Sequence, residues 1–131
     1  MARGMIVDSN AVGKDTQFEP PFVIAWGVDS NTVGSQTITM GRTIVPPGTR
    51  DLKPHFHQCE AVFYVAKGSI RVWLGEEREE HVVPAGCFVY SPAGEVHRLE
   101  NMSQTEEAEL VFTYGNCPNR EAAGTVYLDA W

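Results

Sequence analysis

Short runs of apolar and β-branched residues, separated by turn residues, recur along the chain. In the clearest run, 37–45, hydrophobic and polar positions alternate, which is typical of a strand with one buried face. Glycine, proline and polar residues separate the runs, and no stretch shows an apolar period of 3.6 residues over three turns. The pattern predicts little helix and strands over the segments 37–45, 60–66, 69–74, 87–91, 96–101 and 108–114.

Many short strands at regular spacing predict an all-β sandwich or barrel. A chain of 131 residues is long enough for one domain with a real core and too short for two. Within it we expect an N-terminal arm or strand over 1–36 and a barrel core over 37–115. We expect a C-terminal extension over 116–131 that packs on the same domain.

The composition excludes several classes of partner. Hydrophobic residues make up 43% and charged residues 21% of the chain, as in an ordinary globular protein. A net charge of −7 argues against nucleic acid and anionic membranes, because both need a basic surface. No apolar run is long enough to cross a bilayer, and no signal peptide is recognisable. The three cysteines form no Cys-x-x-Cys pair, which favours a reducing, cytoplasmic location.

Two histidines stand two residues apart in the segment KPHFHQCE, at His55 and His57. Alternate side chains of a strand share a face, so both rings should point the same way. A lone histidine in a β core is more often hydrogen-bonded scaffold than ligand. A third one, His97, lies in another predicted strand, and a neighbouring strand could bring it to the pair as a metal site. The remaining His81 follows the acidic stretch 75–80 and is expected at the surface.

The second half of the chain carries a set of regularly spaced residues around His97. Five residues separate the first two members of this set, one residue the next two, then two and three residues: Gly86, Pro92, Gly94, His97 and Asn101. This spacing resembles the second motif of the cupin family. The resemblance covers about residues 41–115. It implies a double-stranded β-helix, the cupin jelly roll, with a metal ion inside the barrel.

The first cupin motif is matched less closely. His55, His57 and Gly68 fit it, but its metal-binding glutamate falls on Ala61, and Glu60 stands one residue early. A shift of one residue turns a strand side chain to the opposite face, so Glu60 should point away from the histidines unless a β-bulge intervenes.

The resemblance therefore implies that His55, His57 and His97 hold a divalent metal ion without a carboxylate beside them. Fe2+ is the expected ion, and Mn2+, Ni2+ and Zn2+ are alternatives, because three imidazoles bind all of these metals. Such a centre keeps two or three open positions and favours an anionic chelating substrate. Cys59 shares the histidine face and is either a further ligand or a small buried residue.

Arg42 and Tyr90 are the candidate catalytic residues. Arg42 lies on an apolar face with Met40 and could pair with an anionic substrate; alternatively its stem packs while its guanidinium reaches solvent. Tyr90 is a candidate proton donor, as is Tyr114, and packing is the alternative role for both.

Cupins with three histidines include non-haem iron dioxygenases that cleave β-diketones or oxidise thiols. The resemblance thus implies an Fe(II) dioxygenase that acts on a small chelating organic substrate. A metal-dependent lyase, isomerase or decarboxylase of the same fold and a non-catalytic small-ligand binding protein remain as alternatives. Val62 and Tyr64 lie on the face opposite to the histidines, where a second sheet or a partner subunit must cover them. Because many cupins are dimers, we expect a homodimer.

Overall fold

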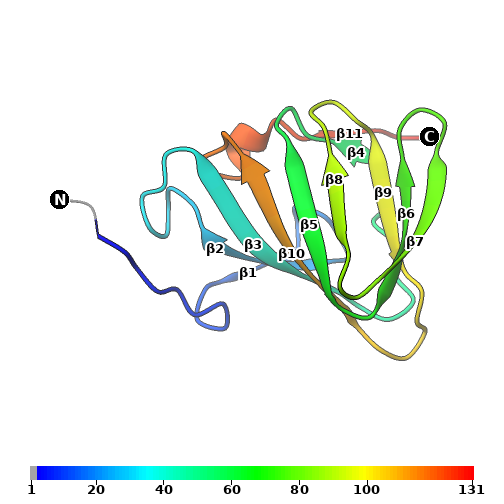
Figure 1. The fold of residues 1–131 in the computed structure, drawn as a ribbon, viewed down its shortest axis with the longest axis horizontal. Coiled ribbons are helices and arrows are strands. Elements are labelled where there is room, and N and C mark those ends of the chain that lie inside the picture. The colour runs from blue at the N-terminus through cyan, green and yellow to red at the C-terminus, as the bar shows by residue number, and fades with distance from the viewer. Residues whose placement is uncertain (1–2) are drawn as a thin grey trace.

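The computed structural model describes residues 3–131, which form two antiparallel β-sheets (Figure 1). The six-stranded sheet has the order β1 (Lys14–Asp15), β2 (Val23–Val28), β3 (Ile38–Val45), β10 (Ala108–Gly115), β5 (Ala61–Lys67) and β8 (Phe88–Ser91). The five-stranded sheet has the order β11 (Val126–Tyr127), β4 (His55–Phe56), β9 (His97–Asn101), β6 (Ser69–Leu74) and β7 (Glu79–Pro84). A 3-10 turn, η1 (Glu121–Ala123), is the one helical element among the described residues. The fold is the jelly roll expected from the sequence.

The six predicted strands all form, and their ends differ from the expected ones by at most one residue. The prediction missed β2 and β7 together with the two-residue strands. In β2 three consecutive residues are buried, so the sequence shows no alternation there. Strand β7 begins with two glutamates, and the sequence pattern assigned these polar residues to a loop.

The core lies between the sheets and follows strand alternation. In β10 every second residue is buried, from Ala108 to Tyr114. In β3 the buried positions are the odd ones, including Thr43 and Val45, so Arg42 lies on the outer face. In β5, Val65 is fully buried and Tyr64 is exposed, which confirms the predicted parity of this strand. Among residues 3–131 we find no helix that is long and apolar enough to cross a membrane.

Two of the motif residues have clear structural roles. Gly68 joins β5 to β6 with a φ of 83°, and a Cβ there would lie 3.1 Å from the Cβ of Ala108. Asn101 is buried at the end of β9, where its Nδ2 donates to the carbonyl oxygens of Val45 (3.0 Å) and Glu106 (2.8 Å). Asn101 therefore ties β9 to the ends of β3 and of the loop before β10.

Candidate metal centre

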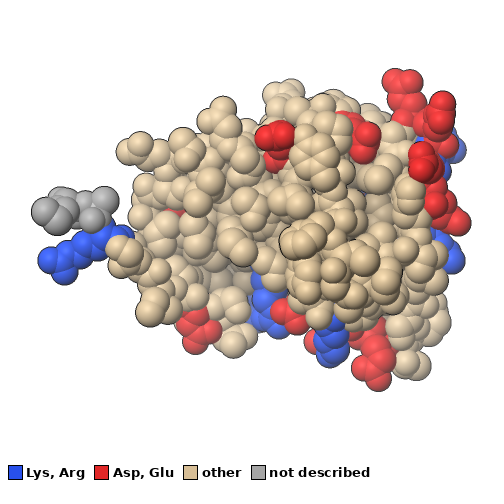
Figure 2. All heavy atoms as spheres, viewed as in Figure 1, with Lys and Arg blue, Asp and Glu red and all other residues tan. Residues whose placement is uncertain are grey.

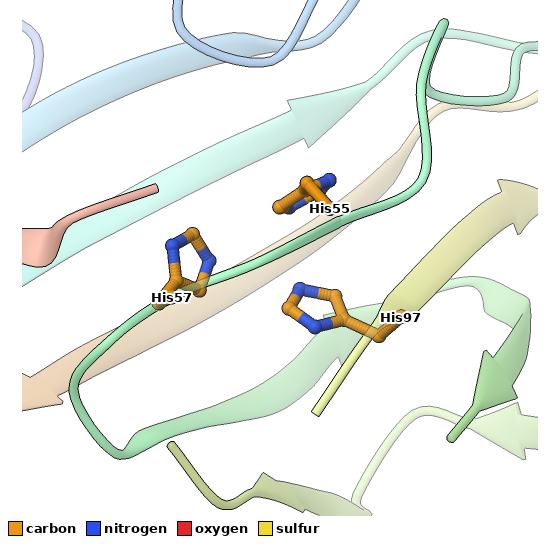
Figure 3. A group of neighbouring side chains, drawn as sticks. All are labelled: His55, His57 and His97. Atoms are coloured by element: carbon orange, nitrogen blue, oxygen red, sulfur yellow. The ribbon is translucent and has the colours of Figure 1, made fainter. Parts of the chain in front are cut away.

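Three histidines, two from neighbouring strands and one from the residue after the first strand, converge inside the sandwich (Figure 3). His55 of β4 is paired in register with His97 of β9, and His57 follows directly after β4. One ring nitrogen from each histidine lies within 4.8 Å of the others, and all three side chains are buried. The antiparallel pairing of β4 with β9 thus brings together residues that are far apart in the sequence.

Each of the three histidines uses its Nδ1 for a bond outside the cluster. The partners are the backbone oxygen of Lys53 for His55 (3.2 Å), Oγ1 of Thr125 for His57 (2.7 Å) and the backbone oxygen of Glu95 for His97 (3.3 Å). A bond of this kind fixes both the tautomer and the ring orientation of a metal-binding histidine. It leaves the three Nε2 atoms as the available ligand atoms.

A divalent metal ion fits this arrangement. Nε2 of His55 is buried and has no hydrogen-bond partner within residues 3–131. Leaving such an atom unsatisfied costs about 1–3 kcal/mol, and a bound cation would remove that cost. Three neutral imidazoles are a suitable ligand set for the divalent metals of the first transition row.

A carboxylate lies beside the cluster, which corrects the sequence-based expectation that none does. Oε1 of Glu19 lies 3.7 Å from Nε2 of His55, and the Glu19 side chain is only 12% exposed. Glu19 belongs to the segment between β1 and β2, where the sequence carries no motif, so only the fold reveals its position.

A second carboxylate faces the other side of the His55 ring. Oδ2 of Asp51 lies 3.6 Å from Nδ1 of His55, and its Oδ1 pairs with Nε of Arg98 at 3.3 Å. Burial raises the pKa of Asp51 to about 7. Asp51 is thus placed to hold the His55 ring in position rather than to bind the ion itself.

The charges in the cluster respond to one another. Burial lowers the pKa of His55, but the carboxylates of Glu19 and Asp51 outweigh it and raise this pKa to about 9. Burial raises the pKa of Glu19, and the neighbouring histidines outweigh that effect and lower it to about 2. Burial together with the charge of His55 lowers the pKa of His57 to about 4 and that of His97 to about 3. Without a metal at neutral pH, His55 is therefore protonated and paired with an ionised Glu19, while His57 and His97 are neutral.

Two cavities lie beside this site and share Glu19 as a wall residue. The inner one, of about 40 Å³, is lined by His57, His97, Ala61 and Glu19 among others, and it has room for little more than an ion and a water molecule. The outer one, of about 250 Å³, reaches His55 from the surface. Its walls are Gln17, Phe18, Glu19, Pro20, Asp51, Leu52, Lys53, His55 and Tyr127. A small organic molecule would approach the cluster through the outer cavity.

The structure places Arg42 and Tyr90 away from the three histidines. Arg42 forms an ion pair with Glu109 on the outer face of the six-stranded sheet. Tyr90 is 55% exposed, and its hydroxyl donates to Glu60 at 2.6 Å. Glu60 therefore points away from the cluster, as strand parity predicts, and no bulge returns it.

Cys59 and Tyr114 differ in their relation to the cluster. Cys59 packs against an apolar group that includes Cys117 and Ala123, and it is not among the residues that meet at the candidate site. Burial raises the pKa of Cys59 to about 11, so the thiol is protonated at neutral pH. The buried Tyr114 places its hydroxyl 3.4 Å from Nε2 of His57.

Comparisons with known proteins agree with this architecture. The cupin domain family matches residues 41–114. The polyketide cyclase RemF from Streptomyces resistomycificus is similar in structure, with a TM-score of 0.74 at 19% identity over 86% of this chain and 80% of that one. KdgF from Halomonas sp. has a TM-score of 0.70 at 15% identity, covering 89% of this chain and 97% of its own.

Larger proteins contain the same fold as one part. An oxalate decarboxylase from Lactobacillus farciminis, in a formate complex, has a TM-score of 0.74 at 19% identity. The match covers 91% of this chain and 34% of the decarboxylase, so the chain spans about a third of that protein. No curated protein sequence matches. At these identities the solved structures show the fold alone, while the domain match covers more than half of the sequence. The chain belongs to the cupin family.

Proposed function

We propose that this cupin is a metal-dependent enzyme that acts on a small chelating organic substrate, and specifically an Fe(II) dioxygenase. The observation that carries the proposal is the convergence of His55, His57 and His97 with each Nδ1 bonded outward. This arrangement supports a metal centre of nitrogen ligands with open positions, and Mn2+, Ni2+ and Zn2+ are the alternative ions. The bound ion would act as a Lewis acid toward a chelating anion.

The outer cavity would position the substrate. Its wall includes the apolar side chains of Phe18, Leu52 and Tyr127 and the ammonium group of Lys53. Lys53 is half exposed and pairs at 3.1 Å with Asp129, an almost fully exposed side chain that an anionic group of the substrate would have to replace. We propose that Lys53 pairs with an anionic group of the substrate while the apolar walls hold its carbon skeleton.

One feature favours a second function, a metal-dependent lyase, isomerase or decarboxylase. Such a reaction needs a group that carries a proton, and the hydroxyl of Tyr114 is buried 3.4 Å from Nε2 of His57. Burial raises the pKa of Tyr114 well above its usual value, so Tyr114 stays protonated and could donate. The cyclase and decarboxylase activities named for two structural neighbours are of this general type.

Oxygen consumption separates these functions. Protein purified without oxygen would be analysed for metal, loaded with Fe2+, and tested with β-diketones, catechols and thiols in an oxygen electrode. Oxygen uptake that the His57→Ala variant lacks would support the dioxygenase. Turnover under strict anaerobiosis would favour the lyase or isomerase instead. Tight binding without turnover under any metal would indicate a small-ligand binding protein.

We also propose that the protein is a homodimer that associates through the outer face of the six-stranded sheet. Tyr64 contacts Phe88 on this face, with ring centroids 5.0 Å apart. One row of register-paired residues crosses strands β3, β10, β5 and β8 on this face. Its members, in order, are Met40, Thr113, Val62 and Tyr90. Charged side chains are few over the middle of the face in Figure 2 and gather toward its edges.

Sedimentation velocity tests this association. A dimer of the wild type that becomes a monomer in Phe88→Glu would support it, and a monomeric wild type at micromolar concentration would contradict it.

The three cysteines are free, which supports the proposed reducing, cytoplasmic location.

A further inference from the structure

The carboxylate that the first cupin motif would supply is missing from its usual strand. Ala61 lines the inner cavity with His57 and His97 and offers no ligand atom there. Glu60 is turned outward and bonds to Tyr90. We infer that Glu19, from the segment between β1 and β2, supplies the fourth metal ligand in this chain. The inference rests on the proposed metal-dependent function.

The position of Glu19 relative to the histidines supports this role. Its Oε1 lies 3.7 Å from Nε2 of His55, the buried atom that lacks a hydrogen-bond partner among residues 3–131. Two atoms bonded to one ion at about 2.1 Å are roughly 3–3.5 Å apart, so these two are close to the separation of shared ligands. Glu19 also lines the inner cavity together with His57 and His97. Only the three histidines have ligand atoms that all lie within 4.8 Å of one another, so the Glu19 carboxylate would have to move toward His57 and His97 to complete a site with three nitrogens and one oxygen.

The backbone that carries Glu19 is fixed from its N-terminal side. Oδ1 of Asp15 accepts the backbone N–H groups of Gln17 (2.9 Å) and Phe18 (3.1 Å). Oδ2 of Asp15 accepts the indole N–H of Trp26 at 2.9 Å. Asp15 therefore holds the turn that leads into Glu19 against the six-stranded sheet.

The same segment is fixed on its other side. The hydroxyl of Tyr127 donates to the backbone oxygen of Phe18, whose ring is stacked on that of His57. The backbone N–H of Leu52 donates to the oxygen of Pro20 at 3.0 Å. These contacts come from both chain ends and from the loop before β4, so Glu19 is held beside the cluster by tertiary structure.

A fourth ligand would change the chemistry of the site. Three neutral imidazoles leave an ion with its full charge of +2, whereas one carboxylate lowers the net charge of the site to +1. It also occupies one of the positions that a chelating substrate could use. Glu19 lines both cavities, so it stands where the substrate would enter.

Titration with Co2+ tests the inference, because its visible absorption reports the coordination of the ion. Metal-free wild type, Glu19→Gln and Glu60→Gln would be titrated with Co2+ in competition with a chromophoric chelator. We expect Glu19→Gln to weaken Co2+ binding at least about tenfold and to change the absorption spectrum. The matched Glu60→Gln variant should retain both the affinity and the spectrum of the wild type.

The outcomes separate this inference from the proposed function. Equal affinity and identical spectra for wild type and Glu19→Gln would overturn the inference and leave the three-histidine centre intact. Failure of the wild type to bind Co2+ would overturn both. Should Glu19→Gln not fold, a crystal structure of the Co2+-loaded wild type decides: a Glu19 oxygen about 2.0–2.2 Å from the ion supports the inference, and a distance beyond 3 Å rejects it.

Discussion

His55 and His97 face each other across strands β4 and β9, with ring centroids 4.5 Å apart. The pairing of these two strands places the backbones of two candidate ligands side by side. His57 adds the third candidate ligand from the residue after Phe56. Strand pairing in this sense positions the candidate metal centre.

Replacement of His97 by alanine should abolish stoichiometric metal binding, because two imidazoles without the third hold an ion far more weakly. The expected loss of affinity is at least about 100-fold, measured by metal analysis after equilibrium dialysis. His81→Ala is the control, since His81 lies in β7 and pairs with Glu79 at 3.1 Å, away from the cluster. Wild-type metal content in His97→Ala would refute the assignment.

Thr125→Val should weaken metal binding about 10–100-fold while the protein stays folded. The substitution removes the Oγ1 atom that fixes the His57 ring through Nδ1 at 2.7 Å, and outer partners of this kind have effects of that size. Thr113→Val, on the outer face of β10, is the matched control. Competition with a chelator measures both. The same affinity in the two variants would show that Thr125 does not position the ring.

Metal affinity should rise with pH up to about pH 9. In the metal-free protein the pKa of His55 is raised to about 9, so below that pH the ion must displace a proton from this ring. The apparent association constant should therefore increase about tenfold per pH unit between pH 7 and 8, with release of about one proton per ion. Calorimetry in buffers of different ionisation enthalpy measures this release. An affinity that is flat over this range would contradict the raised pKa.

Lys53→Met should raise KM for an anionic substrate about tenfold and change kcat little, because in its proposed role Lys53, in the wall of the outer cavity, would bind the substrate away from the reacting atoms. Lys67→Met is the control, since Lys67 ends β5 away from the outer cavity. Steady-state kinetics with the substrate found in the oxygen-electrode screen provides the measurement. A fall in kcat at constant KM would argue against this role.

Asn101→Ala should lower the free energy of unfolding by about 1–3 kcal/mol, because the carbonyl groups of Val45 and Glu106 would lose their buried donor. Urea unfolding of metal-free protein measures the change. Asn116→Ala is not a suitable comparison, because its positive φ of 48° adds a backbone effect. Asn10→Ala, at an exposed turn, is the better control.

The sequence predicted the part of the site that depends on strand alternation. The faces of His55, His57 and Ala61, and the outward turn of Glu60, follow from a period of two and were predicted correctly. Arg42 was placed on an apolar face, but this face is the outer one, and alternation alone does not say which face meets the core.

Other features could not be predicted, because they depend on how distant segments pack. Glu19 reaches the cluster through a turn held by Asp15 and Tyr127, and no periodicity or motif marks that turn. Asp51 and Thr125 are likewise placed by loops rather than by strands. Strand β2 was missed because burial of Ile24, Ala25 and Trp26 in succession removes the alternation that identifies a strand.

The central claim is that His55, His57 and His97 hold one metal ion through their Nε2 atoms. Anomalous diffraction from crystals of the Fe2+-loaded protein, grown without oxygen, tests it most directly. The account predicts a single anomalous peak about 2.0–2.2 Å from all three Nε2 atoms, with each Nδ1 still bonded to its outer partner. A peak at another position, or three histidine rings that remain without an ion at saturating metal, would contradict it.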